Sequence, residues 1–372
     1  MTRTRDDTLE GVASRSVTTD RLETHYLESG GGTGSGGTAS KHGGANSAPT
    51  VVFLHGNVSS SRFFEDILVS LPERYRAIAP DLRGYGDSET KSVDATNGLG
   101  DFGADLRALV SELDLETPFT LVGWSNGGGV AMRYAIDNPE AVDSLVLVNP
   151  LSPYGFGGTK GTDGTPCFDD FAGCGGGLGN DAFVGGLADR DRSEGGEASP
   201  RKILRTYYVA PSHTFDSERE ESYLTGMLDT VTGEENYPGN ATTSENWPGV
   251  APGETGVNNA ISPKYCSLEE ITEIDPDEKP PVLWLRGDSD QIVSNESLFD
   301  VGTLGQMGQL PDWPGEDVFP PQPMVEQTRA VLEAYADAGG EFEEVVFGKT
   351  GHAPQIEVPG DFLNRLESVL SG

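Results

Sequence analysis

The chain has 372 residues, in which 60 aspartates and glutamates outnumber 25 lysines and arginines, for a formal net charge of −35. Because such an acidic surface repels nucleic-acid phosphate and anionic lipid, we expect neither nucleic acid nor an anionic membrane as a partner. There is no apolar run of membrane-spanning length, and residues 1–7 lack a signal peptide's apolar segment, which favours a cytoplasmic protein.

The first predicted elements alternate between strands and helices. Residues 21–28 alternate polar and apolar side chains, as a half-buried antiparallel strand does. Residues 30–48 are rich in glycine, serine and threonine, which predicts a flexible surface loop. The β-branched and aromatic run 50–54 is typical of a parallel strand buried on both faces. A helix over 62–71 and a strand over 75–79 follow.

A helix over residues 99–113 leads to the stretch that we expect to carry the chemistry. The apolar strand 119–123 runs into a Gly-Trp-Ser-Asn-Gly motif at 123–127 with Ser125 at its centre, and a helical pattern follows. Gly-x-Ser-x-Gly between a strand and a helix is the nucleophile elbow, a turn so sharp that the serine backbone is strained. Since the chain contains 50 glycines, an ordinary glycine-rich turn is the alternative.

The pattern then breaks off for more than a hundred residues. After a strand over 142–148, residues 151–275 are dominated by Gly, Pro, Asn and acidic residues, with helices predicted at 201–209 and 217–228. Such an interruption inside an α/β domain indicates an inserted lid, and the strand–helix alternation around it predicts a doubly wound, mostly parallel sheet. We therefore divide the chain into a first core part (1–150), a lid or cap (151–275) and a second core part (276–372).

The second core part returns to the alternation. A strand over 281–286 is followed by a proline-rich insertion (302–323), a helix over 324–338, a strand over 342–347 and a terminal helix over 362–370. Because the carboxyl ends of parallel strands meet at one edge of a sheet, polar residues after the strands are expected to gather there. They include Asp288 and Asp290 after one strand and His352 after the last.

The three cysteines point to no metal or disulfide framework. The gap between Cys167 and Cys174 fits no common zinc site and no histidine lies near them, while Cys266 is distant in sequence. We interpret all three as small packing residues and leave a bridge between the first two open.

The order Ser125, Asp290, His352, each after a different strand, resembles the α/β-hydrolase superfamily. The turns His55-Gly56-Asn57 and 81–88 stand where that superfamily carries its oxyanion turn and a post-strand turn. The resemblance covers roughly residues 20–150 and 280–372, and the lid matches no subfamily that we can name. It implies an α/β-hydrolase fold with an inserted lid.

The resemblance also implies the site roles. Ser125 would be the nucleophile, His352 the base that takes its proton, and Asp290 the carboxylate that orients the imidazole. The backbone N–H groups of Asn57 and Asn126 would form the oxyanion hole. His55 is the competing base and Asp288 the competing acid, and we interpret both as structural, together with the polar turn Asp81, Arg83 and Asp87.

A serine at the nucleophile position predicts acyl transfer, since the haloalkane dehalogenases and epoxide hydrolases of this superfamily attack with aspartate. We expect a serine hydrolase that cleaves a carboxylic ester or related acyl compound, with a small-molecule substrate and neither metal nor cofactor. The alternatives are a carbon–carbon bond hydrolase, an amidase or aminopeptidase, a cofactor-free perhydrolase, and a non-catalytic binding protein of the same fold.

The charge balance carries one more expectation. Only 7 of the 25 basic residues are lysine, and the surplus of carboxylates opposes the compact state through self-repulsion. Molar salt shortens the screening length to about 3 Å and removes that penalty. The composition therefore resembles that of proteins from halophilic archaea, with an acidic protein from an ordinary cell as the alternative.

Overall fold

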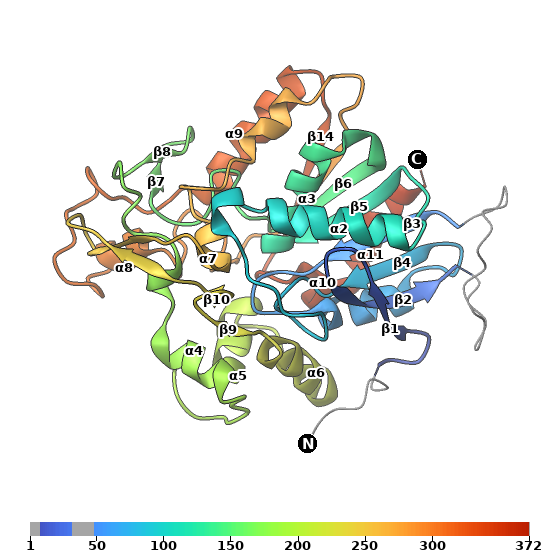
Figure 1. Ribbon diagram of the computed structural model, residues 1–372, viewed down its shortest axis with the longest axis horizontal. Helices are drawn as coiled ribbons and strands as arrows, with labels where there is room; N and C mark the ends of the chain where they lie inside the picture. Colours follow the sequence, from blue (N-terminus) through green and yellow to red (C-terminus); the bar gives the residue numbers. More distant parts are fainter. Residues whose placement is uncertain (1–7, 32–47, 372) are drawn as a thin grey trace.

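The computed structural model, which describes residues 8–31 and 48–371, is built on one eight-stranded sheet (Figure 1). The strand order is β1-β2-β4-β3-β5-β6-β13-β14; the pairs β1–β2 and β2–β4 are antiparallel and the others parallel. This confirms the predicted mostly parallel sheet. The bounds are β1 (Ala13–Thr18), β2 (Glu23–Gly30), β3 (Thr50–Leu54), β4 (Arg76–Pro80), β5 (Phe119–Trp124), β6 (Val142–Val148), β13 (Val282–Gly287) and β14 (Phe342–Phe347).

Helices cover both faces of this sheet, which explains why its central strands are buried throughout and mostly apolar. Every residue of β3 and β5 is buried. Successive side chains of β3 point to opposite faces, so Val52 and Leu54 join one hydrophobic core while Val51 and Phe53 join the other. The first core includes side chains of α2 (Gly100–Glu112), α3 (Asn126–Asp137) and α9 (Met324–Asp337), and the second includes those of α1 (Glu65–Ser70) and α11 (Pro359–Leu370).

Most predicted elements are present with shifted ends. The predicted ranges 142–148, 217–228 and 342–347 coincide with β6, α6 (Ser217–Leu228) and β14. The helix predicted over 201–209 is instead α5 (Pro200–Ile203), which continues as a π-helical turn over Leu204–Tyr208. Of the glycine-rich loop predicted over 30–48, residues 32–47 lie outside the described part of the chain.

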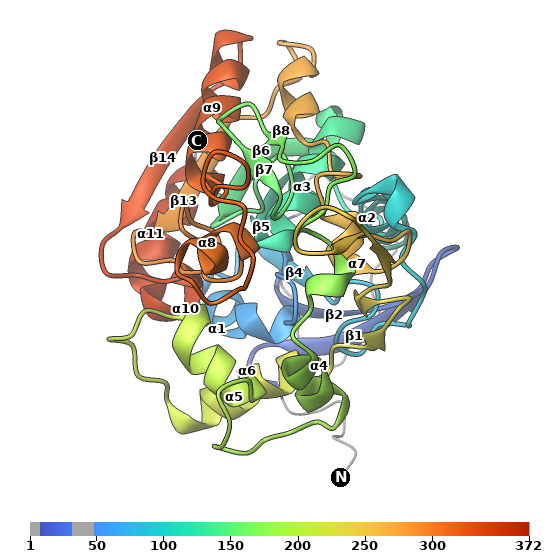
Figure 2. The same ribbon diagram turned by 90° about the vertical axis from the view of Figure 1, so that its left-hand side faces the viewer.

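Residues 151–275, which we call the cap segment, contribute no strand to the main sheet. They form short helices and three two-stranded pieces instead, and α4, α5 and α7 lie together with α8 on the side of the molecule that Figure 2 faces. Helix α4 (Asp181–Ala188) and helix α8 (Val301–Gln306), inside the proline-rich insertion, were not predicted. The remaining α-helix and strands here are α7 (Val257–Ala260) and β7 to β12, at Thr159–Lys160, Thr165–Pro166, Thr232–Gly233, Tyr237–Pro238, Ala241–Thr243 and Val250–Pro252.

Among the helices of residues 8–31 and 48–371, none combines the length and apolar character needed to cross a membrane. The cysteines Cys167, Cys174 and Cys266 are free thiols, so the bridge left open by the sequence is not formed. Burial raises the pKa of the Cys174 and Cys266 thiols, which keeps them protonated and agrees with their interpretation as packing residues.

Candidate active site

Ser125 lies on a turn between β5 and α3 that only small neighbours can form. Its φ of 56° and ψ of −122° lie in a region that residues with a side chain rarely adopt. A Cβ on Gly123 would lie 2.3 Å from the carbonyl oxygen of Gly127, and a Cβ on Gly127 would lie 2.3 Å from that of Leu54. The glycines of the motif are therefore required by the close approach of backbone, as expected for a strained strand-to-helix turn.

A second part of the site is a buried imidazole–carboxylate pair. Nδ1 of His352 lies 2.8 Å from Oδ2 of Asp290, and both side chains are 2% exposed. The other carboxylate oxygen of Asp290 accepts the N–H groups of Ile292 (2.8 Å) and Val293 (3.1 Å). With the shared proton on Nδ1, Nε2 of His352 is left as a proton acceptor. The structure thus brings the predicted base and the predicted acid together.

One cavity connects this pair with the serine. Ser125, His352, Asn57 and Asn126 all line it. The turn that carries Asn57 packs on the serine, because a Cβ on Gly56 would lie 2.9 Å from Cβ and 3.4 Å from Oγ of Ser125. Within residues 8–31 and 48–371, no backbone carbonyl accepts the N–H of Asn57 or Asn126, so both donors are available to a ligand. The catalytic roles of these residues remain a prediction.

The two competing residues are engaged elsewhere. His55 is completely buried, its Nε2 accepts the N–H of Leu82 at 3.0 Å, and burial lowers its pKa. Asp288 is exposed and its Oδ1 accepts the N–H of Lys349 at 2.6 Å, which ties the loop after β13 to the loop after β14. Both contacts agree with the structural roles that the sequence suggested.

The polar turn after β4 is also structural in its contacts. Asp81 lies 2.7 Å from Nδ1 of His25 and accepts the N–H of Ser61 at 2.8 Å. Arg83 donates twice to Asp105, at 2.6 and 2.8 Å. The side chains of His25, Asp81, Arg83 and Asp105 do not line the cavity that contains Ser125. They hold the turn against the helices beside it.

Three side chains to which the sequence analysis assigned no role hold the loop of His352. The carbonyl oxygen of His352 accepts Nε1–H of Trp124 at 2.7 Å and Nδ2–H of Asn149 at 2.9 Å. Glu357 accepts the N–H of Gly351 at 2.7 Å and that of Ala210, in the cap segment, at 2.8 Å. The only sequence signal for Asn149 was its place at the carboxyl end of a strand, and Glu357 had none.

Glu357 predicts a pH-dependent stability. Burial raises its pKa to about 7, whereas a glutamate in the unfolded chain titrates near about 4.3. Between these values the folded chain holds a proton that the unfolded chain has released, so this group's contribution to stability is lost as the pH rises through that window. We expect the Glu357→Gln variant to lack this part of the pH dependence in denaturant unfolding.

The exposed Glu341→Gln change is the matched control, since it removes the same charge without removing a buried titration. A difference in unfolding free energy between wild type and Glu357→Gln that stays constant from pH 4.5 to 7.5 would contradict the assignment.

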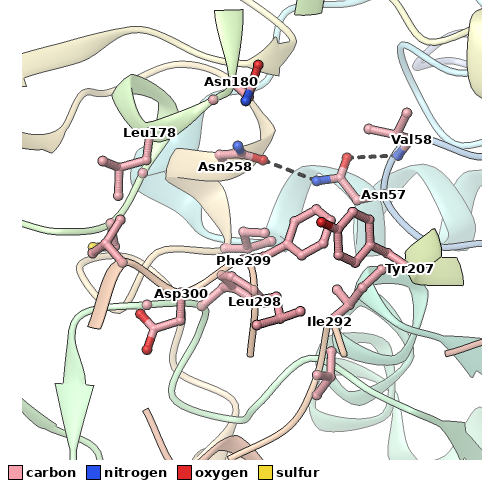
Figure 3. Close-up of a pocket in the computed structure, with 18 of the residues that line it drawn as sticks. Asn57, Val58, Leu178, Asn180, Tyr207, Asn258, Ile292, Leu298, Phe299 and Asp300 are labelled. Atoms are coloured by element: carbon pink, nitrogen blue, oxygen red, sulfur yellow. Dashed lines mark hydrogen bonds between the residues drawn. The ribbon is translucent and has the colours of Figure 1, made fainter. Parts of the chain in front are cut away.

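The cavity has a volume of about 520 Å³, with a floor from the strand ends and walls from the cap segment and residues 292–310 (Figure 3). The side chain of Asn57 is not free to meet a substrate, because it donates to Asn258 (3.1 Å) and accepts from Val58 (3.0 Å) and from the hydroxyl of Tyr85 (2.6 Å). Within the described ranges, no group of three or more His, Cys, Asp or Glu residues is arranged to hold a metal.

Known proteins resemble this chain in both sequence and fold. A family model described as alpha/beta hydrolase fold matches residues 49–161. The pimeloyl-[acyl-carrier protein] methyl ester esterase of Nitrosomonas europaea is 35% identical over 100 residues, which are 27% of this chain and 36% of the relative. The chain thus matches about a third of the length of its curated relatives.

Two solved structures align over 97% of this chain and 100% of their own at 18% identity: an esterase from Exiguobacterium antarcticum (TM-score 0.55) and a bromoperoxidase from Bacillus anthracis (TM-score 0.58). At this identity the likeness concerns the fold. The sheet topology, the family-model match over 49–161 and these two alignments show that this chain has the α/β-hydrolase fold.

Proposed function

We propose that this protein is a serine hydrolase that cleaves a small carboxylic ester or related acyl compound, with Ser125, His352 and Asp290 as its triad. The observation that carries the proposal is the buried His352–Asp290 pair on the same cavity as a strained, glycine-flanked serine. A hydroxyl is a weak nucleophile without an adjacent base, and the base in turn needs a group that orients it.

The reaction would proceed in two acyl transfers. Nε2 of His352 takes the proton of Ser125 as Oγ attacks the carbonyl carbon, and Asp290 stabilises the imidazolium that forms. The tetrahedral oxyanion accepts the N–H groups of Asn57 and Asn126, each worth about 2.7–4 kcal/mol of barrier. The imidazolium then protonates the departing alcohol, and an acyl-enzyme remains on Oγ. A water deprotonated by His352 attacks the acyl carbon and releases the carboxylic acid and Ser125.

The same residues could serve a carbon–carbon bond hydrolase, an amidase, an aminopeptidase or a cofactor-free perhydrolase. The esterase among the sequence relatives favours an ester over these alternatives. A non-catalytic binding protein of this fold has no need of a histidine–aspartate pair on the same cavity as the serine, so the pair favours an enzyme.

Labelling with a fluorophosphonate probe tests the proposal. This reagent phosphonylates an activated serine, so we expect wild-type protein in molar salt to be labelled, and Ser125→Ala and His352→Ala to remain unlabelled. Labelling should stop when the protein is first unfolded, because activation requires the assembled site. Persistent labelling of Ser125→Ala would place the nucleophile elsewhere.

We also propose that the protein works in the salt-rich cytoplasm of a halophilic organism. The support is the net charge of −35, because its self-repulsion opposes the compact state in dilute buffer. Molar salt shortens the screening length to about 3 Å and removes that repulsion. The unfolding midpoint is expected to rise by roughly 5 °C or more between 0.1 M and 2 M KCl, followed by circular dichroism at constant pH. A midpoint that stays constant over this range contradicts the proposal.

A further inference from the structure

The cavity above Ser125 is lined almost entirely by uncharged residues. Among the described residues that line it, there is no lysine, arginine or glutamate. Besides the proposed base, His352, the one side chain there that can carry a full charge near neutral pH is Asp300. The contacts of Asp300 therefore decide whether the cavity presents a charge to a ligand.

Asp300 is committed to the protein backbone. Its side chain begins α8, where Oδ1 accepts the N–H of Gly302 at 3.3 Å and Oδ2 accepts that of Gln322 at 2.9 Å. The residue is 1% exposed, and burial raises its pKa to about 6. Its carboxyl group thus fixes the two ends of the 302–322 segment, and in its ionised form it would repel a substrate carboxylate rather than hold one.

The walls away from Ser125 are apolar and aromatic. The rings of Tyr207 and Phe299 meet edge to face, with centroids 5.0 Å apart, and Ile292 and Leu298 lie beside them (Figure 3). Leu304, on α8, continues this wall. The amide oxygen of Asn180, on the wall, accepts two N–H groups at the start of α4, so this oxygen is committed to the helix cap.

We propose, resting on the proposed hydrolase function, that the substrate is an uncharged ester with an apolar acyl group, and that the cavity itself rejects acyl groups bearing a carboxylate. An ionised carboxylate loses its hydration on entry and finds no cation to replace it. An apolar chain gains by the same transfer, by about fourfold in kcat/KM for each methylene buried.

The test compares two esters that differ only in the end of the acyl chain, p-nitrophenyl hexanoate and the mono-p-nitrophenyl ester of hexanedioic acid. We expect kcat/KM for the hexanoate to exceed that for the carboxylate ester by about 100-fold or more. The ratio should persist from 0.2 M to 2 M KCl, because bulk salt screens the acidic surface but cannot solvate a buried carboxylate. A ratio that collapses in high salt would assign the discrimination to the surface and overturn the proposal.

A lysine in the wall should weaken the preference for the hexanoate. Leu304 is partly buried, so Leu304→Lys can place its ammonium in the cavity, and Leu304→Met is the control of similar size without charge. We expect Leu304→Lys to lower the ratio at least tenfold and Leu304→Met to leave it within about twofold. Leu310→Lys, at a second partly buried lining position, repeats the test if the first variant does not fold.

Failure of this inference can be told apart from failure of the proposed function. If Ser125 is not labelled by the fluorophosphonate probe, the hydrolase proposal fails. If Ser125 is labelled but both esters are cleaved within threefold of one another, or neither is cleaved, the assigned substrate class is wrong. A lysine variant that folds and leaves the ratio unchanged would also overturn it, because this wall would then not contact the acyl group.

Discussion

The Ser125→Ala variant is expected to lose ester hydrolysis by about 10⁴- to 10⁶-fold in kcat. Alanine keeps the Cβ and accepts the same strained backbone, so the elbow between β5 and α3 should persist while the attacking oxygen is gone. The ester carbonyl of the substrate would still accept the N–H groups of Asn57 and Asn126, so KM should change little. Initial rates with p-nitrophenyl hexanoate in molar salt measure the loss.

The matched control for this variant is Ser70→Ala. Ser70 ends α1 on the exposed surface, where its hydroxyl donates to the carbonyl of Asp66. The rate of ester hydrolysis by Ser70→Ala should stay within about twofold of wild type, as is usual for a surface substitution. Ester cleavage by Ser125→Ala at more than a hundredth of the wild-type rate, in protein shown to be folded by circular dichroism, would exclude Ser125 as the nucleophile.

The sheet could be predicted from the sequence because its signal is local. Strands covered on both faces contain unbroken apolar runs, such as residues 51–54 of β3 and 145–148 of β6, and their alternation with helices determines a parallel sheet. Strand β1 was missed because it lies at the edge, where half-exposed residues such as Ser14 and Arg15 give no apolar pattern. The elbow was predictable for the same local reason, since its glycines and serine are adjacent in sequence.

The cap segment and the supports of the site could not be predicted in this way. Helix α4 contains two glycines, which lower helix propensity, and its helical state depends on the Asn180 cap and on packing of Phe183 and Leu187. Glu357 is tied to Ala210, 147 positions away in sequence, so no local pattern could pair them. Such contacts arise only once the fold has brought distant segments together.

The choice of Asp290 over Asp288 came from resemblance, and the contacts now give it a physical basis. Both residues follow β13, two positions apart. Asp290 is buried against His352, whereas Asp288 faces solvent at the turn. Sequence alone could not tell them apart, because which of the two carboxylates meets the imidazole depends on how the loop after β13 folds over β14.

The Asp290→Asn variant is expected to reduce kcat by about 10⁴-fold with little change in KM. The reason lies in the second oxygen of this carboxylate, which accepts the N–H groups of Ile292 and Val293. An amide at this position must keep its oxygen toward those two donors, so its NH₂ group faces Nδ1 of His352. Nδ1 then becomes the acceptor, and the imidazole proton moves to Nε2, where it blocks proton transfer from Ser125.

Asp288→Asn is the matched control, because its amide oxygen can still accept the N–H of Lys349 while the same charge is removed. We expect that variant to stay within about threefold of wild type in kcat. Stopped-flow or steady-state rates at neutral and at alkaline pH separate the two variants, since a changed tautomer is not restored by raising the pH. If Asp288→Asn shows the larger loss, or if Asp290→Asn retains wild-type kcat, then the carboxylate that orients His352 has been assigned to the wrong residue.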